Sequence, residues 1–207
     1  MLKNFLNNIF SKKKNNLSEE IKVNRKTIFG FWIYIMSDCI IFSTIFAVYF
    51  VMVHNVSNGP SGKDFFNLKF VFLETFFLLL SSLCFSIAIN FVKKCNSFMV
   101  MIFLFLVFIL GFLFITIEFT EFLNLFRNNY IPSRSGFLSS FYTLLWLHGF
   151  HVICGLFWII LMIFQIYVLG IDKIIRTRIL CLSIFWHFLD IIWIFLFTFV
   201  YLFGVIK

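Results

Sequence analysis

Five acidic side chains are the residues best placed to do chemistry, because they lie inside or at the ends of long apolar runs. They are Asp38, Glu74, Glu118, Glu121 and Asp190, more than half of the chain's nine carboxylates. An ionisable group at membrane depth is costly unless it is paired, protonated or turned toward protein. These carboxylates therefore predict an integral membrane protein in which such groups serve function or assembly.

Most of the polar side chains in the apolar runs occur as pairs three residues apart. This spacing puts both members of a pair on one face of an α-helix. The pairs are Glu118 with Glu121, His148 with His151, and His187 with Asp190.

Other residues are expected to support these faces. Small residues let helices approach closely, and indole or hydroxyl groups can hydrogen-bond between helices. The relevant residues are Gly111, Gly149, Gly155, Trp186 and Trp193, together with Ser81 on the face of Glu74 and Tyr34 one turn before Asp38.

Three kinds of site are compatible with these residues. A di-iron site in a four-helix bundle uses Glu-x-x-His on two helices, and the chain has no such motif. A proton pathway uses intramembrane carboxylates and histidines, but it needs a continuous hydrated chain that a sequence cannot reveal. Hydrogen bonding between helices needs only pairwise contacts. We favour this structural role for the three pairs and predict no metal ligands.

The elements that position these residues are predicted to be transmembrane helices. The chain is 62% hydrophobic and only 13% charged, too apolar for a soluble domain of 207 residues. About 20 apolar residues span the hydrocarbon core. Five stretches qualify, so we predict an all-α integral membrane bundle of five transmembrane helices in residues 28–207, preceded by a tail at 1–27. The predicted spans are 28–53, 70–92, 98–126, 137–169 and 179–206.

The distribution of basic residues predicts the orientation of the bundle. One side of a five-span topology holds twelve Lys and Arg residues, in the N-terminal tail and the second and fourth loops, and the other side holds five. The positive-inside rule places the N-terminus in the cytoplasm and the C-terminus in the periplasm. The net charge of +8 does not predict nucleic acid binding, because the basic residues sit at membrane boundaries.

Several strings of residues, in their order along the chain, resemble one family. They begin at Gly30-Phe-Trp-Ile-Tyr-Ile-Met-Ser-Asp38 and Glu74-Thr-Phe-Phe, and continue with Arg134-Ser-Gly-Phe-Leu-Ser. The most specific are His148-Gly-Phe-His-Val and Trp186-His-Phe-Leu-Asp-Ile-Ile-Trp. From about residue 27 the chain resembles subunit III of the haem–copper terminal oxidases, with the greatest similarity to the cytochrome bo type ubiquinol oxidases of bacteria.

The resemblance implies roles for single residues. Asp38 stands where many cytochrome c oxidase members have a buried carboxylate, usually Glu. Glu121 matches a family carboxylate, while Glu118 occupies a position where mitochondrial-type members tend to have Gln. His148, His151, His187 and Asp190 fall on the family's motif positions. Mitochondrial-type members have seven spans, and the chain lacks the first two, whose place a small subunit IV is expected to take.

The resemblance also implies a function. Subunit III is expected to bind no haem, copper or quinone, and to pack against subunit I, which holds the haem and copper and uses ubiquinol. The complex, which also contains subunit II and membrane lipid, oxidises ubiquinol, reduces oxygen to water and pumps protons across the bacterial inner membrane. The alternatives are subunit III of a five-span bacterial cytochrome c oxidase and an independent membrane di-iron enzyme.

Overall fold

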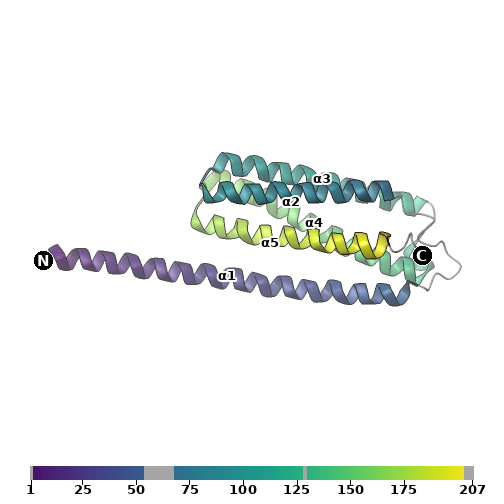
Figure 1. The fold of residues 1–207 in the computed structure, drawn as a ribbon, viewed down its shortest axis with the longest axis horizontal. Coiled ribbons are helices and arrows are strands. Elements are labelled where there is room, and N and C mark those ends of the chain that lie inside the picture. Colours follow the sequence, from purple (N-terminus) through teal and green to yellow (C-terminus); the bar gives the residue numbers. More distant parts are fainter. Residues whose placement is uncertain (1, 54–67, 128–129, 203–207) are drawn as a thin grey trace.

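The fold was obtained as a computed structural model that describes the backbone of residues 2–53, 68–127 and 130–202. Side chains are described from residue 26, except at 54–69, 128–129, 134 and 203–207. The described part is all-helical (Figure 1). Its elements are α1 (Leu2–Met52), α2 (Leu68–Lys93), α3 (Ser97–Arg127), η2 (Pro132–Arg134), α4 (Gly136–Leu169), α5 (Lys173–Leu196) and η3 (Phe197–Leu202).

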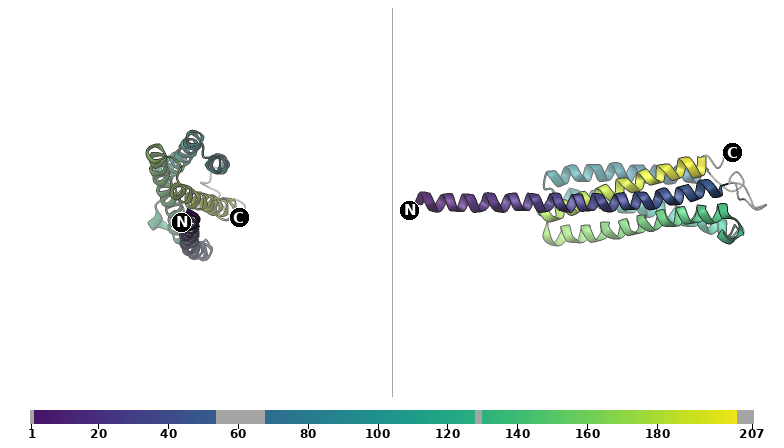
Figure 2. Two further views of the ribbon diagram at one scale, coloured as in Figure 1. Left: turned by 90° about the vertical axis from the view of Figure 1, so that its left-hand side faces the viewer. Right: turned by 90° about the horizontal axis from the view of Figure 1, so that it is seen from below.

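Five helices within the described residues are long and apolar enough to cross a membrane, which confirms the predicted fold class. α1 has no break near residue 27, so one helix contains the charged N-terminal segment and the first span. In Figures 1 and 2 its N-terminal part projects beyond the other helices. The end of the fifth predicted span, after residue 202, and the connection at 54–67 lie outside the described residues.

α5 begins at Lys173, before the predicted start of the fifth span at residue 179. Gly170 ends α4 with a positive φ of 72° and donates its N–H to the Ile166 carbonyl. The Arg176 N–H already donates to the Asp172 carbonyl in the first turn of α5. In the sequence, the charged residues of this turn look like a loop. They form a helix end instead, from which long basic side chains can extend to the membrane surface.

The helix ends divide into two sets. The N-terminal part of α1, the α2–α3 turn and the α4–α5 turn lie at one end of the molecule, and the described part of the chain finishes at the other (Figure 1). This is the arrangement that a five-span topology requires. The α4–α5 turn is tied to its neighbours there, since Arg176 Nη2 lies 3.1 Å from Cys95 Sγ and Arg178 donates to Gln165 Oε1.

α5 is the central helix of the bundle. In the most apolar 18-residue stretch of α5, 67% of the residues are buried, whereas in the other four spans this share is 22–33%. α5 packs against α1, α2 and α4. Trp186 lies in a slot between α3 and α4, because a methyl group added at Gly111 or Gly155 would come within 2.9 or 3.0 Å of its indole ring. The expectation that these glycines permit close helix approach is confirmed.

We predict that filling this slot destabilises the bundle. Gly111→Leu should clash with Trp186 and Leu156, and overpacking of this kind costs about 1–3 kcal/mol. Tryptophan fluorescence during heating of the purified protein in mild detergent should show a lower unfolding temperature. Gly30→Leu is the matched control, because a methyl group there meets no atom within 4 Å. Equal unfolding temperatures for the two variants would contradict the tight slot.

Candidate functional site

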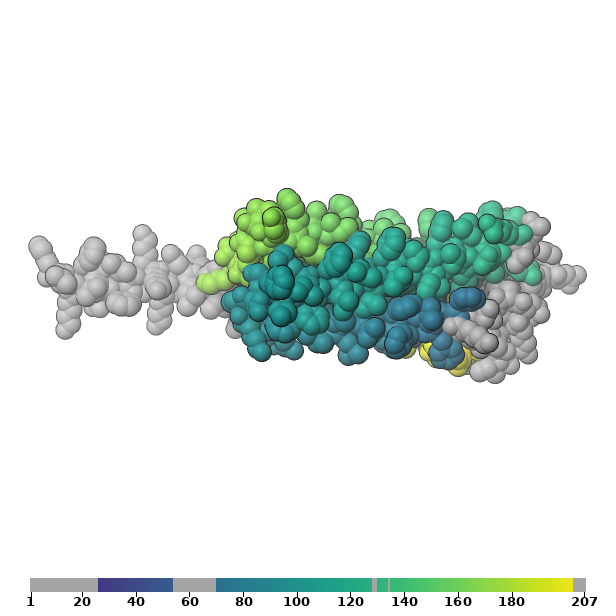
Figure 3. Space-filling model, turned by 90° about the horizontal axis from the view of Figure 1, so that it is seen from above, coloured from purple at the N-terminus to yellow at the C-terminus, as the bar shows by residue number. Residues whose placement is uncertain are grey.

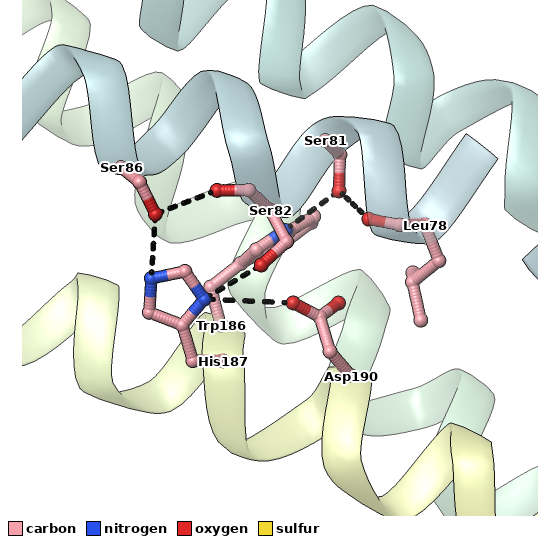
Figure 4. Close-up of polar contacts among 7 residues, drawn as sticks. All are labelled: Leu78, Ser81, Ser82, Ser86, Trp186, His187 and Asp190. Carbon is pink, nitrogen blue, oxygen red and sulfur yellow. Dashed lines mark hydrogen bonds and ion pairs between the residues drawn. The ribbon is translucent and has the colours of Figure 1, made fainter. Parts of the chain in front are cut away.

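A row of hydrogen bonds between side chains, which we call the polar seam, joins α2 to α5, and Figure 4 shows part of it. Trp186 Nε1 donates to Ser81 Oγ at 2.9 Å, and Trp193 Nε1 donates to Thr75 Oγ1 at 3.0 Å. Both hydroxyls in turn donate to carbonyls of their own helix. The two indoles are fully buried. The predicted polar face of α2 is therefore turned toward α5 and holds the two tryptophans in position.

His187 and Asp190 extend this seam toward the surface of the bundle. His187 Nδ1 lies 2.7 Å from Ser82 Oγ and 3.6 Å from Asp190 Oδ2, while Nε2 lies 3.5 Å from Ser86 Oγ (Figure 4). The His187 side chain is 36% exposed, whereas Asp190 is buried. The two predicted partners thus meet each other and two serines of α2.

Asp38 and His151 form the polar contact between α1 and α4. Asp38 Oδ2 lies 3.9 Å from His151 Nε2. The other ring nitrogen, Nδ1, lies 2.8 Å from the Leu147 carbonyl of the same helix. A proton on Nδ1 would donate to that carbonyl and leave Nε2 to face the carboxylate. The contact is partly buried and aligns the first span with the fourth.

His148 lies apart from His151 although the two are three residues apart. Its ring is fully buried and packs at 5.3 Å from the Trp193 ring and 5.9 Å from the Phe114 ring. Neither ring nitrogen has a hydrogen-bond partner among the described residues. The histidine pair therefore serves two different helix contacts, one toward α1 and one toward α3 and α5.

Three glutamates gather on α2 and α3. Glu74 is fully buried, and neither of its carboxyl oxygens has a hydrogen-bond partner in the described part of the chain. Glu121 also has one buried oxygen without such a partner. The Glu118 carboxyl lies against Gly149 of α4, where an added methyl group would be 3.2 Å from both oxygens. Burial of an unpartnered ionised carboxylate is costly, so these groups need a proton or a further partner.

The described residues offer no cluster of three His, Cys, Asp or Glu side chains that could hold a metal ion. Of the predicted polar residues, Asp38 with His151 joins α1 to α4, and His187 joins α5 to α2, whereas Glu74 has no such contact among the described residues. Sequence reasoning missed Ser82 and Ser86 as partners of His187. Their spacing of four residues places them on one face of α2, but no signal in the sequence says which helix that face meets.

The comparisons with known proteins cover nearly the whole chain. The sequence profile of cytochrome c oxidase subunit III matches residues 4–205. The chain belongs to that family. As a subunit III of the haem–copper oxidases, it is a multi-pass membrane protein of an oxidase complex that contains other subunits.

Individual relatives share up to about half of their residues with the chain. The chain is 48% identical over 195 residues to a cytochrome bo(3) ubiquinol oxidase subunit 3 of Buchnera aphidicola, covering 94% of the chain and 100% of the relative. It is 47% identical over 178 residues to the protein of that name in Pseudomonas aeruginosa, covering 86% and 85%. It is 36% identical over 183 residues to a quinol oxidase subunit 3 of Bacillus subtilis, covering 88% and 90%.

Proposed function

We propose that the chain is the non-catalytic subunit III of a cytochrome bo type ubiquinol oxidase. The observation that carries the proposal is the similarity, along almost the full length, to proteins named as subunit 3 of such oxidases. The complex oxidises ubiquinol, reduces oxygen to water and pumps protons in aerobic respiration. Haem, copper and the ubiquinol that is oxidised belong to subunit I, and this chain packs against it beside subunit II and a small subunit IV.

The surroundings of the three described histidines support this division of labour. An axial haem ligand or a copper ligand must present a ring nitrogen to open space beside the helix. His148 is enclosed by aromatic rings, His151 is directed to Asp38, and His187 is directed to serines. These residues serve to fix the helices, and the chain contributes a rigid surface to the complex.

We assign an assembly role to most of the polar groups. Trp186 and Trp193 fix α5 on α2, and His187 with Asp190 adds a contact on the same seam. Asp38 differs, because α1 has no other contact of this kind to α4 among the described side chains. We infer that Asp38 influences proton delivery or lipid contact through the placement of α1.

We infer that the chain lies in the bacterial inner membrane with its N-terminus in the cytoplasm. The basic excess of twelve against five supports this orientation, since cytoplasmic segments carry more Lys and Arg. The grouping of the α2–α3 and α4–α5 turns at the end where α1 projects fits the same topology.

A five-span cytochrome c oxidase is the second candidate complex. The family's name favours it, while the names of the similar relatives favour a quinol oxidase. The two differ in the electron donor, which the partner subunits select.

We predict that the chain copurifies with a haem-bearing subunit. A tagged chain purified in mild detergent should bring a large partner, and a reduced-minus-oxidised spectrum should show haem that is lost when the partner is stripped away. The same sample should oxidise ubiquinol and leave reduced cytochrome c unchanged. Oxidation of cytochrome c instead would select the second candidate. Isolation of the chain alone with stoichiometric iron would overturn both.

We predict that Cys95 faces the cytoplasm. Cys95 is exposed in the α2–α3 turn, so a membrane-impermeant maleimide should label it in inside-out vesicles and leave it unlabelled in intact spheroplasts. Cys95→Ser is the control for labelling at other cysteines. Ser133→Cys, made in the Cys95→Ser background and placed in η2 just before α4, should show the reverse pattern. Labelling of Cys95 in intact spheroplasts would contradict the proposed orientation.

We predict that Asp38→Ala weakens the packing of α1 against α4. Loss of one interhelical contact in a membrane costs about 0.6–1.7 kcal/mol, so the variant complex should lose this subunit more readily and turn over more slowly. Subunit content, ubiquinol turnover and protons pumped per electron are measured together. Asp38→Asn should retain more function than Asp38→Ala, and Ser37→Ala, at an exposed neighbour, is the control. Unchanged values for Asp38→Ala would remove any role for Asp38.

A further inference from the structure

A groove between α3 and α4 is the feature that the proposed assembly role leaves unexplained. Its volume is about 400 Å³, and we call it the Glu118 groove. The residues of α3 that line it share one face of the helix, and α4 supplies the opposite wall. Figure 3 shows the side of the molecule on which α3 lies along α4. The lining residues used below are Glu118, Phe119, Phe122, Tyr142, Trp146 and Gly149.

Glu118 supplies a polar group inside this otherwise apolar groove. Its carboxyl is partly exposed and lies beside Gly149, where the absence of a side chain leaves room for it. No hydrogen bond or ion pair joins this carboxyl to another described residue. A carboxyl group facing hydrocarbon without a partner is unfavourable. The groove therefore offers a strong hydrogen-bonding group to whatever enters it.

Aromatic rings form the wall beside this carboxyl. Phe122 stacks on Trp146 with centroids 6.3 Å apart and an interplanar angle of 29°, and it meets Tyr142 edge-on at 4.8 Å. The Tyr142 hydroxyl donates to the Tyr130 carbonyl, which holds that ring in place. Phe119 and Trp146 remain 57% and 66% exposed. A flat ring can stack on such a wall while its edge reaches the carboxyl.

The depth of Glu118 restricts the chemistry of the occupant. Glu118 lies nine residues before Arg127, the last residue of α3, which is about 14 Å along a helix. Arg127 is expected at the membrane surface, because a charged side chain is disfavoured deeper. The charged head of a phospholipid stays at that surface and does not reach Glu118. A quinol can, because its ring dissolves in hydrocarbon and carries hydroxyl donors.

We propose that the Glu118 groove binds the head ring of an isoprenoid quinol, with a ring hydroxyl donating to Glu118 and the tail leaving toward lipid. The inference rests on the proposed function for the identity of the ligand, ubiquinol. It departs from the family expectation that subunit III binds no quinone. In this proposal the site holds quinol and raises the local supply of substrate to the complex.

The test uses the whole purified complex in lipid nanodiscs, without oxygen, with an azido-ubiquinol photoprobe kept in its reduced form. Peptide mapping should find the label on the α3 segment 118–122 or the α4 segment 142–149. In Glu118→Ala the probe concentration for half-maximal labelling should rise about tenfold, as expected for the loss of a hydrogen bond to a charged group. Glu118→Gln, which keeps an acceptor, should fall between this variant and the wild type.

Thr120→Ala is the matched control. Thr120 is exposed on α3, does not line the groove, and donates to the Ile117 carbonyl of its own helix, so its loss should leave labelling unchanged. Excess ubiquinol should compete with the probe, and excess phosphatidylethanolamine should not. Labelling that Glu118→Ala does not weaken would overturn the inference. So would a cryo-EM map of the complex in which a partner helix or a phospholipid fills the groove.

The outcome separates this inference from the proposed function. A complex that oxidises ubiquinol but shows no label in these segments removes the quinol site and leaves the function in place. A complex without ubiquinol oxidation removes the proposed function, whatever the labelling pattern.

Discussion

The position of Trp186 is the interaction on which the rest of the bundle depends. From α5 this one side chain donates to Ser81 of α2 and fills the space left by Gly111 of α3 and Gly155 of α4. Lipid is as apolar as the helices, so apolar burial alone gives them little reason to associate. Close packing at the two glycines and a buried hydrogen bond supply specific contacts. The order of α2, α3 and α4 around α5 follows from them.

α1 packs on the rest of the bundle through a different set of contacts. Phe31 meets Trp158 edge-on at 5.8 Å, and Phe42 meets Phe188 at 6.2 Å. Asp38 lies between these aromatic contacts along α1 and makes the polar contact with His151 of α4. α1 packs on α4 and α5 and is the least buried span. Neighbouring subunits can therefore influence the position of α1 more than that of the other helices.

The sequence predicts where the helices lie along the chain, but it does not predict which helices contact one another. Long apolar runs mark the helices because a bilayer requires them. α5 begins before its apolar run, because its first turns carry basic residues. Helical spacing correctly predicts that His148 and His151 project from related positions, but not that they serve different helices. Nor does apolar content report burial. α3 is the most apolar span, but only one third of the residues in its most apolar stretch are buried. In the less apolar α5 this share is two thirds.

The carboxylates fall into two classes, and the difference bears on what the chain can do. Asp38 and Asp190 each lie within 4 Å of a histidine nitrogen, although Asp38 Oδ2 and both Asp190 carboxyl oxygens have no hydrogen-bond partner among the described residues. Glu74, Glu118 and Glu121 have no such partner among the described residues. A protein whose only task was to hold its own helices together would gain nothing from them, because an apolar side chain would pack there without cost. Their presence argues that protons, water or a bound molecule complete this part of the bundle within the assembled oxidase.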